Sequence, residues 1–210
     1  MSVTELIHVD AALIVASKPA GLLSVPGRGT DKADCLWARV HSQFADALIV
    51  HRLDMATSGL IALARGAVAQ RSLSIAFAER RVDKTYEAVV DGLLSQDHGE
   101  IDRPLAADWP NRPRQIVCTV RGKASLTRWR VMARDLTHGR TRLALQPITG
   151  RSHQLRVHLA SIGHAIVGDE LYASPTVAAA APRLLLHASR LALHHPIDGG
   201  PMSFESSAPF

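Results

Sequence analysis

The segment from residue 48 to residue 63 constrains the fold most strongly, because it places a short charged turn between two apolar runs. Leu48 to Val50 enters the turn and Leu60 to Leu63 leaves it, and both runs have the composition of β-strands. Thr57, Ser58 and Gly59 between them are residue types that favour tight turns. We therefore expect a strand, a turn and a second strand.

Arg52 and Asp54 lie within this turn, two residues apart. An aspartate held at the end of a strand beside a cation can stay ionised and point into a cleft, which suits a catalytic carboxylate. The alternative is that Asp54 only accepts hydrogen bonds from backbone amides of its own turn, as aspartate commonly does. The turn by itself leaves both interpretations open, and the rest of the chain has to decide between them.

Length and composition predict a folded cytoplasmic protein. The chain has 210 residues, of which 47% are hydrophobic, enough for one domain with a sizeable core. No uncharged apolar run is long enough to span a membrane, and no secretory signal pattern is visible at the N-terminus. Cys35 and Cys118 show no metal-site spacing, so we expect two reduced cysteines in the core.

The charge balance favours an acidic partner. The formal net charge is +5, with 24 lysines and arginines against 19 acidic residues. Arginine predominates over lysine, and its planar guanidinium suits paired contacts with phosphates and stacking on bases. Nucleic acid or an acidic substrate is therefore one explanation, and a solvated basic surface is the other.

Hydrophobic periodicity and turn residues predict a fold of many strands and few helices. Helices are expected to begin at Asp34, capped by that residue, and at Ser152, and others at 67–80 and from Ser174. Residues 99–115 are expected to be a polar loop interrupted by prolines. Strands are expected within 6–16, 84–90, 184–193 and 202–206, with a hairpin formed by 123–134 and 140–148. The pattern predicts an α+β chain built on one large, mainly antiparallel sheet.

Several segments carry a resemblance to a known family. In chain order they are His51-Arg52-Leu53-Asp54 with Thr57-Ser58-Gly59, Lys84-Thr85-Tyr86, Gly150 to His158, and Leu184 to Ala188. Together they resemble the signature segments of the RluA family of RNA pseudouridine synthases, over nearly the whole chain. The resemblance implies the pseudouridine synthase fold, a mixed sheet flanked by helices and loops with a central active-site cleft. It also implies a single catalytic domain over residues 1–210, without an N-terminal S4-type RNA-binding domain.

The resemblance also implies roles for individual residues in a cofactor-free, metal-free isomerisation of uridine to pseudouridine. Asp54 corresponds to the catalytic carboxylate, Tyr86 to the tyrosine against the target base, and Arg156 to the basic partner of the aspartate. Leu184 and Leu186 correspond to the lining of the uracil pocket. Arg52 corresponds to an arginine that enters the RNA near the vacated base. Further candidate RNA contacts are His51, Thr57, Arg112, Arg114, Arg151, His153 and Gln154.

The implied partners are RNAs, namely a hairpin of 23S rRNA and the anticodon stem-loop of tRNA, bound by a monomer. A synthase acting only on rRNA or only on tRNA is the alternative. Proteins read sequence most easily in unpaired RNA loops, where extruding a nucleotide into a pocket also costs least. A loop shape shared by the two RNAs would let one small domain accept both.

The chemistry explains why such residues are needed. Isomerisation breaks the C1′–N1 bond and joins C1′ to C5, so the freed uracil must rotate without escaping. An ionised carboxylate can attack C1′ or remove a sugar proton, and the sequence leaves both open. In a water-poor pocket desolvation opposes ionisation, and a guanidinium such as that of Arg156 restores the charged form of Asp54.

Other function classes fit less well. The chain has 11 histidines, but His153 and His158 are five residues apart and no HExxH pattern occurs, which argues against a metal-dependent hydrolase. A serine hydrolase is disfavoured because no GxSxG pattern occurs. A non-catalytic RNA-binding assembly factor is the last alternative, and the presence of Asp54, Tyr86 and Arg156 together argues against it.

Overall fold

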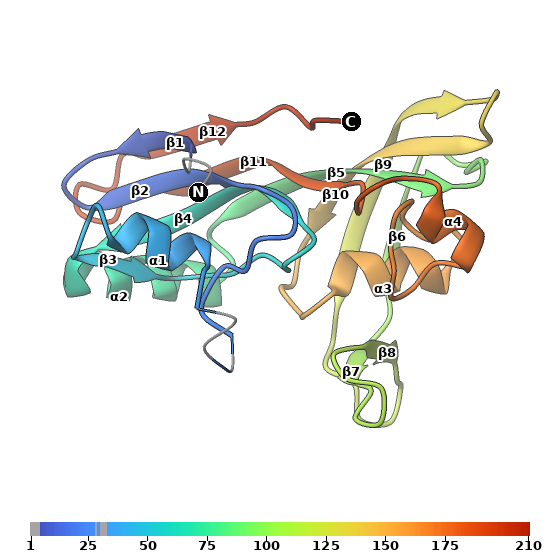
Figure 1. Cartoon of the computed structure of the whole chain (residues 1–210), viewed down its shortest axis with the longest axis horizontal. Helices are drawn as coiled ribbons and strands as arrows, with labels where there is room; N and C mark the ends of the chain where they lie inside the picture. The colour runs from blue at the N-terminus through green and yellow to red at the C-terminus, as the bar shows by residue number, and fades with distance from the viewer. Residues whose placement is uncertain (1–4, 28, 30–32) are drawn as a thin grey trace. The chain divides into compact units, whose positions relative to one another are not determined.

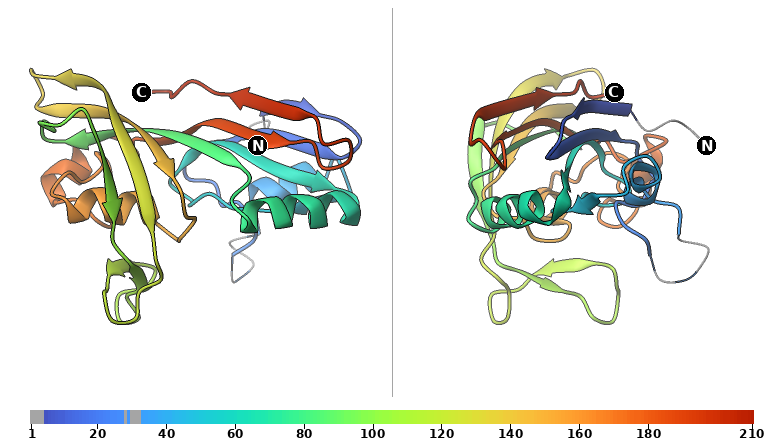
Figure 2. Two further views of the ribbon diagram at one scale, coloured as in Figure 1. Left: turned by 180° about the vertical axis from the view of Figure 1, so that it is seen from behind. Right: turned by 90° about the vertical axis from the view of Figure 1, so that its left-hand side faces the viewer.

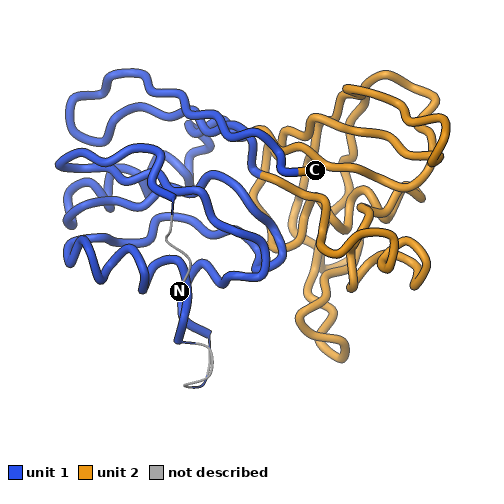
Figure 3. The backbone as a smooth tube through the Cα atoms, turned by 45° about the horizontal axis from the view of Figure 1, so that its top comes forward, with its two compact units in different colours: residues 1–84, 188–209 blue, residues 85–187, 210 orange. Residues whose placement is uncertain are grey.

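The computed structural model describes residues 5–27, 29 and 33–210. The chain divides into two compact units (Figure 3). The first unit contains residues 1–84 and 188–209, and the second contains residues 85–187 with residue 210. One catalytic domain over the whole chain stays a prediction, because it concerns how the two units act together.

The first unit is built on strands β1 (Glu5–Val9), β2 (Leu13–Lys18) and β4 (Ser58–Arg65), which lie side by side in that order. β3 (Ala47–Ile49) also pairs with β4, and β12 (Pro201–Glu205) pairs with β11 (Leu186–His194). The pairs β1–β2, β2–β4, β3–β4 and β11–β12 are antiparallel. Two helices, α1 (Leu36–His41) and α2 (Gly66–Ala78), complete the unit (Figure 1).

β4 is the central strand of this unit and is buried along almost its whole length. Its apolar run predicted a strand, and α2 packs against it and against β3. Leu60 of β4, Leu13 of β2 and Leu73 of α2 belong to one hydrophobic cluster, and each is at most 1% exposed. A strand buried on both faces reads as a continuous apolar run, which is the pattern seen here.

The second unit contains β5 (Asp83–Asp91), β10 (Arg140–Pro147), β9 (Leu126–Asp135) and β6 (His98–Asp102), side by side in that order and antiparallel. A separate antiparallel hairpin is formed by β7 (Leu105–Ala107) and β8 (Gln115–Val117). Figure 2 shows it beyond the ends of β6 and β9. Helix α3 (Gln154–Ser161) packs against β8, β9 and β10, and α4 (Pro175–Ala179) follows it in the chain.

The predicted α+β class with mainly antiparallel strands is confirmed, and three local predictions were wrong. Cys35, not Asp34, is the N-cap of α1, because its Sγ accepts from the Ala38 amide while Asp34 is paired with Arg39. His153, not Ser152, precedes α3. Residues 99–115 are not all loop, since they contain β7 and parts of β6 and β8. Among the described residues no helix is both long and apolar enough to cross a membrane.

Candidate active site

Asp54 lies in the loop of residues 50–57 that joins β3 to β4, which we call the Asp54 loop. The Thr57 amide donates to the Asp54 carbonyl oxygen at 3.1 Å and closes a turn. Ser24 supports the residue before Asp54, because its Oγ donates to the Leu53 carbonyl at 2.8 Å and accepts from the Leu53 amide at 3.1 Å. Thr57 is only 2% exposed, which favours a structural role over the predicted RNA contact.

Lys18 supports the loop on the other side of Asp54. Its side chain is fully buried at the end of β2, and its Nζ donates to the carbonyl oxygens of Pro19, Leu22 and Met55 at 2.9, 2.7 and 3.0 Å. A buried ammonium is tolerated when such acceptors replace water. Met55 follows Asp54, so the backbone is held on both sides of the carboxylate. Sequence analysis missed Lys18 because a lysine before a Pro-Ala-Gly turn looks like part of the turn.

His51 has a partly buried ring whose hydrogen bonds are internal. Its Nε2 accepts from the Ala62 amide at 2.9 Å, and the ring stacks on Phe77 with centroids 4.3 Å apart. Burial, followed by the positive charge of Lys84, lowers the pKa of His51 to about 3. These contacts favour a structural role over the predicted RNA contact. Arg52, the next residue, is exposed and keeps its predicted role.

Stability is expected to fall in mild acid because of His51. Its folded-state pKa of about 3 lies below the ordinary value of 6.5, so the unfolded chain gains a proton first as the pH drops. The contribution of His51 to the free energy of unfolding is complete above pH 6.5 and is lost as the pH falls toward 3. Between pH 6.5 and pH 5 the free energy of unfolding is expected to fall by up to about 2 kcal/mol. Urea unfolding at both pH values should show this dependence in the wild type and a weaker one in His51→Gln. The exposed His98→Gln should keep the wild-type dependence, and equal behaviour of the two variants would contradict the assignment.

Tyr86 lies in β5, opposite Leu145 of β10. Its side chain shares a strand face with Ala88 and Val90, both of which are fully buried. The ring itself is half-buried. Tyr86 is therefore set at the edge of an apolar surface, a position from which a flat ring can contact a base.

Arg156 is on α3 and is 4% exposed. Its Nε and Nη2 donate to Oδ2 and Oδ1 of Asp169 at 2.8 and 2.6 Å, a bidentate pair with a fully buried carboxylate. Asp169 Oδ1 also accepts from the amides of Leu171 and Tyr172. Sequence analysis missed Asp169, and the predicted pairing of Arg156 with Asp54 stays a prediction.

Gln154 begins α3 and is 3% exposed. Its Nε2 donates to the Leu126 carbonyl and to Thr127 Oγ1, both at 3.0 Å. Its Oε1 accepts from Thr149 Oγ1 at 2.7 Å and from the Arg151 amide at 3.1 Å. These bonds use both ends of the side-chain amide within the protein, which argues against the predicted RNA contact.

The remaining basic candidates are exposed or lie at the start of α3. Arg151 and Arg112 are exposed, and the Arg112 guanidinium stacks on the Trp109 indole with its Cζ 3.2 Å from the ring centroid. Arg114 is exposed as well. His153 is half-buried, with a backbone φ of 54° in the left-handed region. The exposed arginines are open to phosphates, and their RNA contacts stay predictions.

In the apolar segment that leads into β11, buried and half-buried side chains alternate. Leu184 and Leu186 are 3% and 2% exposed, whereas Leu185 between them is only half-buried. The Leu185 amide donates to the Val167 carbonyl at 3.0 Å and its carbonyl accepts from the Val89 amide at 3.1 Å, so its backbone is fixed. Leu185 therefore has the most accessible side chain in the segment predicted to line the uracil pocket.

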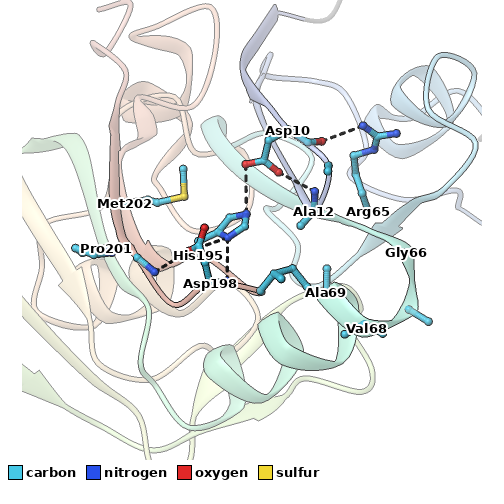
Figure 4. A pocket seen from close by; sticks show the side chains of 14 residues that line it. Asp10, Ala12, Arg65, Gly66, Val68, Ala69, His195, Asp198, Pro201 and Met202 are labelled. Atoms are coloured by element: carbon cyan, nitrogen blue, oxygen red, sulfur yellow. Dashed lines mark hydrogen bonds and ion pairs between the residues drawn. The ribbon is translucent and has the colours of Figure 1, made fainter.

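A pocket of about 690 Å³ lies in the first unit (Figure 4). It surrounds Arg65, the last residue of β4, whereas the Asp54 loop precedes the first residue of that strand. The polar groups of the pocket bind one another: His195 to Asp10 at 3.4 Å and to Asp198 at 3.0 Å, and Arg65 Nη1 to the Asp10 carbonyl at 2.9 Å. None of the predicted site residues lines it. Within the described residues, no group of histidine, cysteine and acidic side chains is arranged to hold a metal ion.

Comparison with known proteins decides the family. Residues 12–161 match the family model described as RNA pseudouridylate synthase. The chain belongs to the RNA pseudouridylate synthase family. The matched region contains Asp54, Tyr86 and Arg156, and enzymes of this family are isomerases that modify RNA.

Full-length relatives of this pseudouridylate synthase support the assignment. It is 51% identical over 204 residues to "Dual-specificity RNA pseudouridine synthase RluA" of Yersinia pestis, covering 97% of this chain and 98% of that protein. The protein of the same name from Escherichia coli (strain K12) is 48% identical over 207 residues, covering 98% and 93%. The predicted family is confirmed.

Solved structures support the fold of this synthase. "Human RNA Pseudouridylate Synthase Domain Containing 1" has a TM-score of 0.83 at 26% identity, covering 99% of this chain and 84% of that one. "Human RNA Pseudouridylate Synthase Domain Containing 4" has a TM-score of 0.76 at 24% identity and is similar in fold. The predicted pseudouridine synthase fold is confirmed.

Proposed function

We propose that this synthase isomerises uridine in two stem-loop RNAs, a 23S rRNA hairpin and the tRNA anticodon stem-loop, with Asp54 as its catalytic carboxylate. The observation that carries the choice of Asp54 is the bracing of its loop by Lys18 and Ser24, whose bonds fix Met55 and Leu53 on either side. Dual specificity is supported by the names of the relatives. An rRNA-only or tRNA-only synthase is the second candidate. Cytoplasmic location and a monomer belong to the same proposal.

The chemistry assigned to Asp54 has two possible first steps. Its carboxylate either attacks C1′ of the nucleotide or removes a sugar proton, and in both cases the C1′–N1 bond breaks. In the first case C5 of the rotated uracil bonds to C1′ as the bond between C1′ and the Asp54 carboxylate breaks. In the second case C5 bonds to C1′ and Asp54 returns the proton to the sugar. In both cases C5 then releases its own proton to solvent. A carboxylate on a braced loop loses little freedom on reaching the reactive geometry, which favours the reaction.

Tyr86, Arg156 and Leu185 are proposed to serve the same reaction. The Tyr86 ring offers a flat face to the detached uracil, and Leu185 offers an accessible apolar side chain. The Arg156 guanidinium is proposed to orient the catalytic carboxylate. Asp169 fixes the plane of that guanidinium through two hydrogen bonds, so Arg156 is presented in one orientation.

RNA binding is proposed to depend on exposed arginines. The target nucleotide must leave the stack to reach a carboxylate, and the exposed Arg52 of the Asp54 loop can stack in the vacated position. Arg112, Arg114 and Arg151 are exposed and suit phosphate contacts. Affinity should therefore fall as the salt concentration rises.

The experiment that tests this function is tritium release from RNA labelled at uridine C5. Wild-type protein is expected to release tritium from both stem-loop transcripts, because the C5 hydrogen leaves when C5 bonds to C1′. Addition of EDTA is expected to leave the rate unchanged, since no step needs a metal ion. Release from one RNA only would establish single specificity. No release from either RNA despite binding would favour a non-catalytic assembly factor, and strong inhibition by EDTA would contradict the metal-free reaction.

A further inference from the structure

Tyr172 connects several parts of the second unit, although no sequence pattern singled it out. Its hydroxyl oxygen lies 2.8 Å from the Gln115 amide nitrogen and 2.7 Å from His153 Nδ1. Its ring centroid lies 5.1 Å from Cζ of Arg156 and 5.5 Å from Cζ of Arg114. One half-buried side chain therefore contacts β8, the residue that precedes α3, and two arginines.

The Tyr172 hydroxyl takes part in two hydrogen bonds, and the direction of one of them follows from its donor. The Gln115 amide can only donate, so the Tyr172 hydroxyl accepts that bond and has its own hydrogen left to donate. It shares a second hydrogen bond with His153 Nδ1, and the tautomer of the imidazole determines which of the two atoms donates. His153 has a φ of 54°, a conformation that costs free energy for a residue with a Cβ. The hydroxyl thus helps to hold a strained residue at the start of α3.

The ring of Tyr172 acts on Arg156 together with Asp169. Asp169 accepts two hydrogen bonds from the guanidinium and one from the Tyr172 amide, at 3.1 Å. The aromatic face lies against the same guanidinium, where a cation is attracted by the ring electrons. Asp169 therefore binds the edge of the Arg156 guanidinium, and the Tyr172 ring lies against its face.

The segment of residues 108–114 just before Gln115 is exposed, basic and internally ordered. Its backbone is closed by the Asp108 amide donating to the Arg114 carbonyl at 3.0 Å, and Asn111 Nδ2 donates to Asp108 Oδ2 at 3.0 Å. Arg112 is stacked on Trp109, an aromatic residue that is 62% exposed. A fixed aromatic and guanidinium surface of this kind suits RNA bases and phosphates.

We propose that Tyr172 is a positioning residue that links segment 108–114 to Arg156, so that RNA held by the segment is presented to an arginine in its working orientation. The inference rests on the proposed function. The two parts of the side chain have separate tasks, because the hydroxyl bonds Gln115 and His153 whereas the ring covers Arg156. Loss of the hydroxyl should weaken RNA binding, and loss of the ring should also slow the reaction.

The test compares Tyr172→Phe with Tyr172→Leu by kcat and KM on the anticodon stem-loop transcript. Tyr172→Phe keeps the ring, and since a neutral hydrogen bond contributes about 1 kcal/mol, KM is expected to rise about fivefold with kcat unchanged. Tyr172→Leu should raise KM similarly and lower kcat by about tenfold, from loss of the ring contact with Arg156.

Thr141→Val is the matched control. Thr141 lies in the same unit and its hydroxyl also forms two hydrogen bonds. Its Oγ1 accepts from the Leu94 amide at 3.1 Å and donates to the Gly92 carbonyl at 2.8 Å. Its removal should cost similar stability and leave KM unchanged. An equal rise of KM in Tyr172→Phe and Thr141→Val would overturn the proposal, as would a fall in kcat without a change of KM in Tyr172→Phe.

A binding measurement separates this proposal from the proposed function. In the Asp54→Asn background, Tyr172→Phe should raise the Kd for a fluorescently labelled anticodon stem-loop about fivefold, because the same hydrogen bonds are lost. That weakening, together with a wild type that forms no pseudouridine, would support the link and overturn the function. An unchanged Kd would overturn the link even if the wild type is active.

Discussion

Asp54→Asn is expected to lower the rate of pseudouridine formation by about a thousandfold or more, the scale seen when a catalytic side chain is removed. The amide has nearly the size of the carboxylate but is uncharged, so it can neither attack C1′ nor remove a sugar proton. The loop backbone should keep its conformation, because it is bonded at Leu53 and Met55 on either side of the substitution. Single-turnover tritium release with excess enzyme measures the rate of the chemical step.

The matched control is Asp46→Asn in the same unit. Asp46 is 45% exposed and pairs with Arg65 at 3.1 Å, and an exposed pair of this kind contributes at most about 1 kcal/mol to stability. Its rate should stay near that of the wild type. Asp54→Asn should also bind the stem-loop as the wild type does. Retained turnover would remove Asp54 from the catalytic role, and lost binding would show that the substitution disturbs more than chemistry.

Local sequence signals predicted the elements well where the interaction that forms them is local. Ser174 caps α4 and Pro175 is its first residue, as their adjacent positions in the sequence indicated. The apolar runs within β2 and β4 predicted strands, and both strands are buried in the structure. The prediction failed for α1, where Asp34 pairs with Arg39 and the Sγ of Cys35 accepts the capping hydrogen bond instead.

The residues of the candidate site also divide into those that local sequence signals predict and those that depend on distant contacts. Asp54, Tyr86 and Arg156 stand in motifs that the sequence displays directly. Ser24 and Lys18 were missed because their bonds reach Leu53 and Met55, 29 and 37 residues away. No pattern in the sequence gives such distances.

Asp169 and Tyr172 were missed for the same reason. Asp169 holds Arg156 from 13 residues away, and Tyr172 bonds the Gln115 amide across 57 residues. For His51 and Gln154 the sequence predicted RNA contacts, whereas the hydrogen bonds of their side chains in the structure are internal. A sequence shows that a side chain can form hydrogen bonds, but the partner is known only once the strands around it are placed.

Gly59→Ala is expected to destabilise the first unit by about 2–5 kcal/mol, the sum of backbone strain and overpacking. Gly59 follows the Asp54 loop at the start of β4 and has a φ of +109°, which is unfavourable for any residue with a Cβ. An added Cβ would lie 2.3 Å from the Ala188 carbonyl oxygen and 2.6 Å from its amide nitrogen. These are backbone atoms of β11, so relief requires one strand to move away from the other.

Gly66→Ala separates the two causes, because Gly66 directly follows β4, has a φ of +77°, and has no atom within 4 Å of an added Cβ. Strain alone should cost about 1–2 kcal/mol there. Urea unfolding of both variants measures the difference, and the excess loss in Gly59→Ala is the cost of the contact with β11. Activity should fall further in Gly59→Ala than the folded fraction accounts for, since the shifted strand begins at the Asp54 loop. Equal destabilisation of the two variants would show that backbone conformation, rather than the close approach of two strands, requires glycine at position 59.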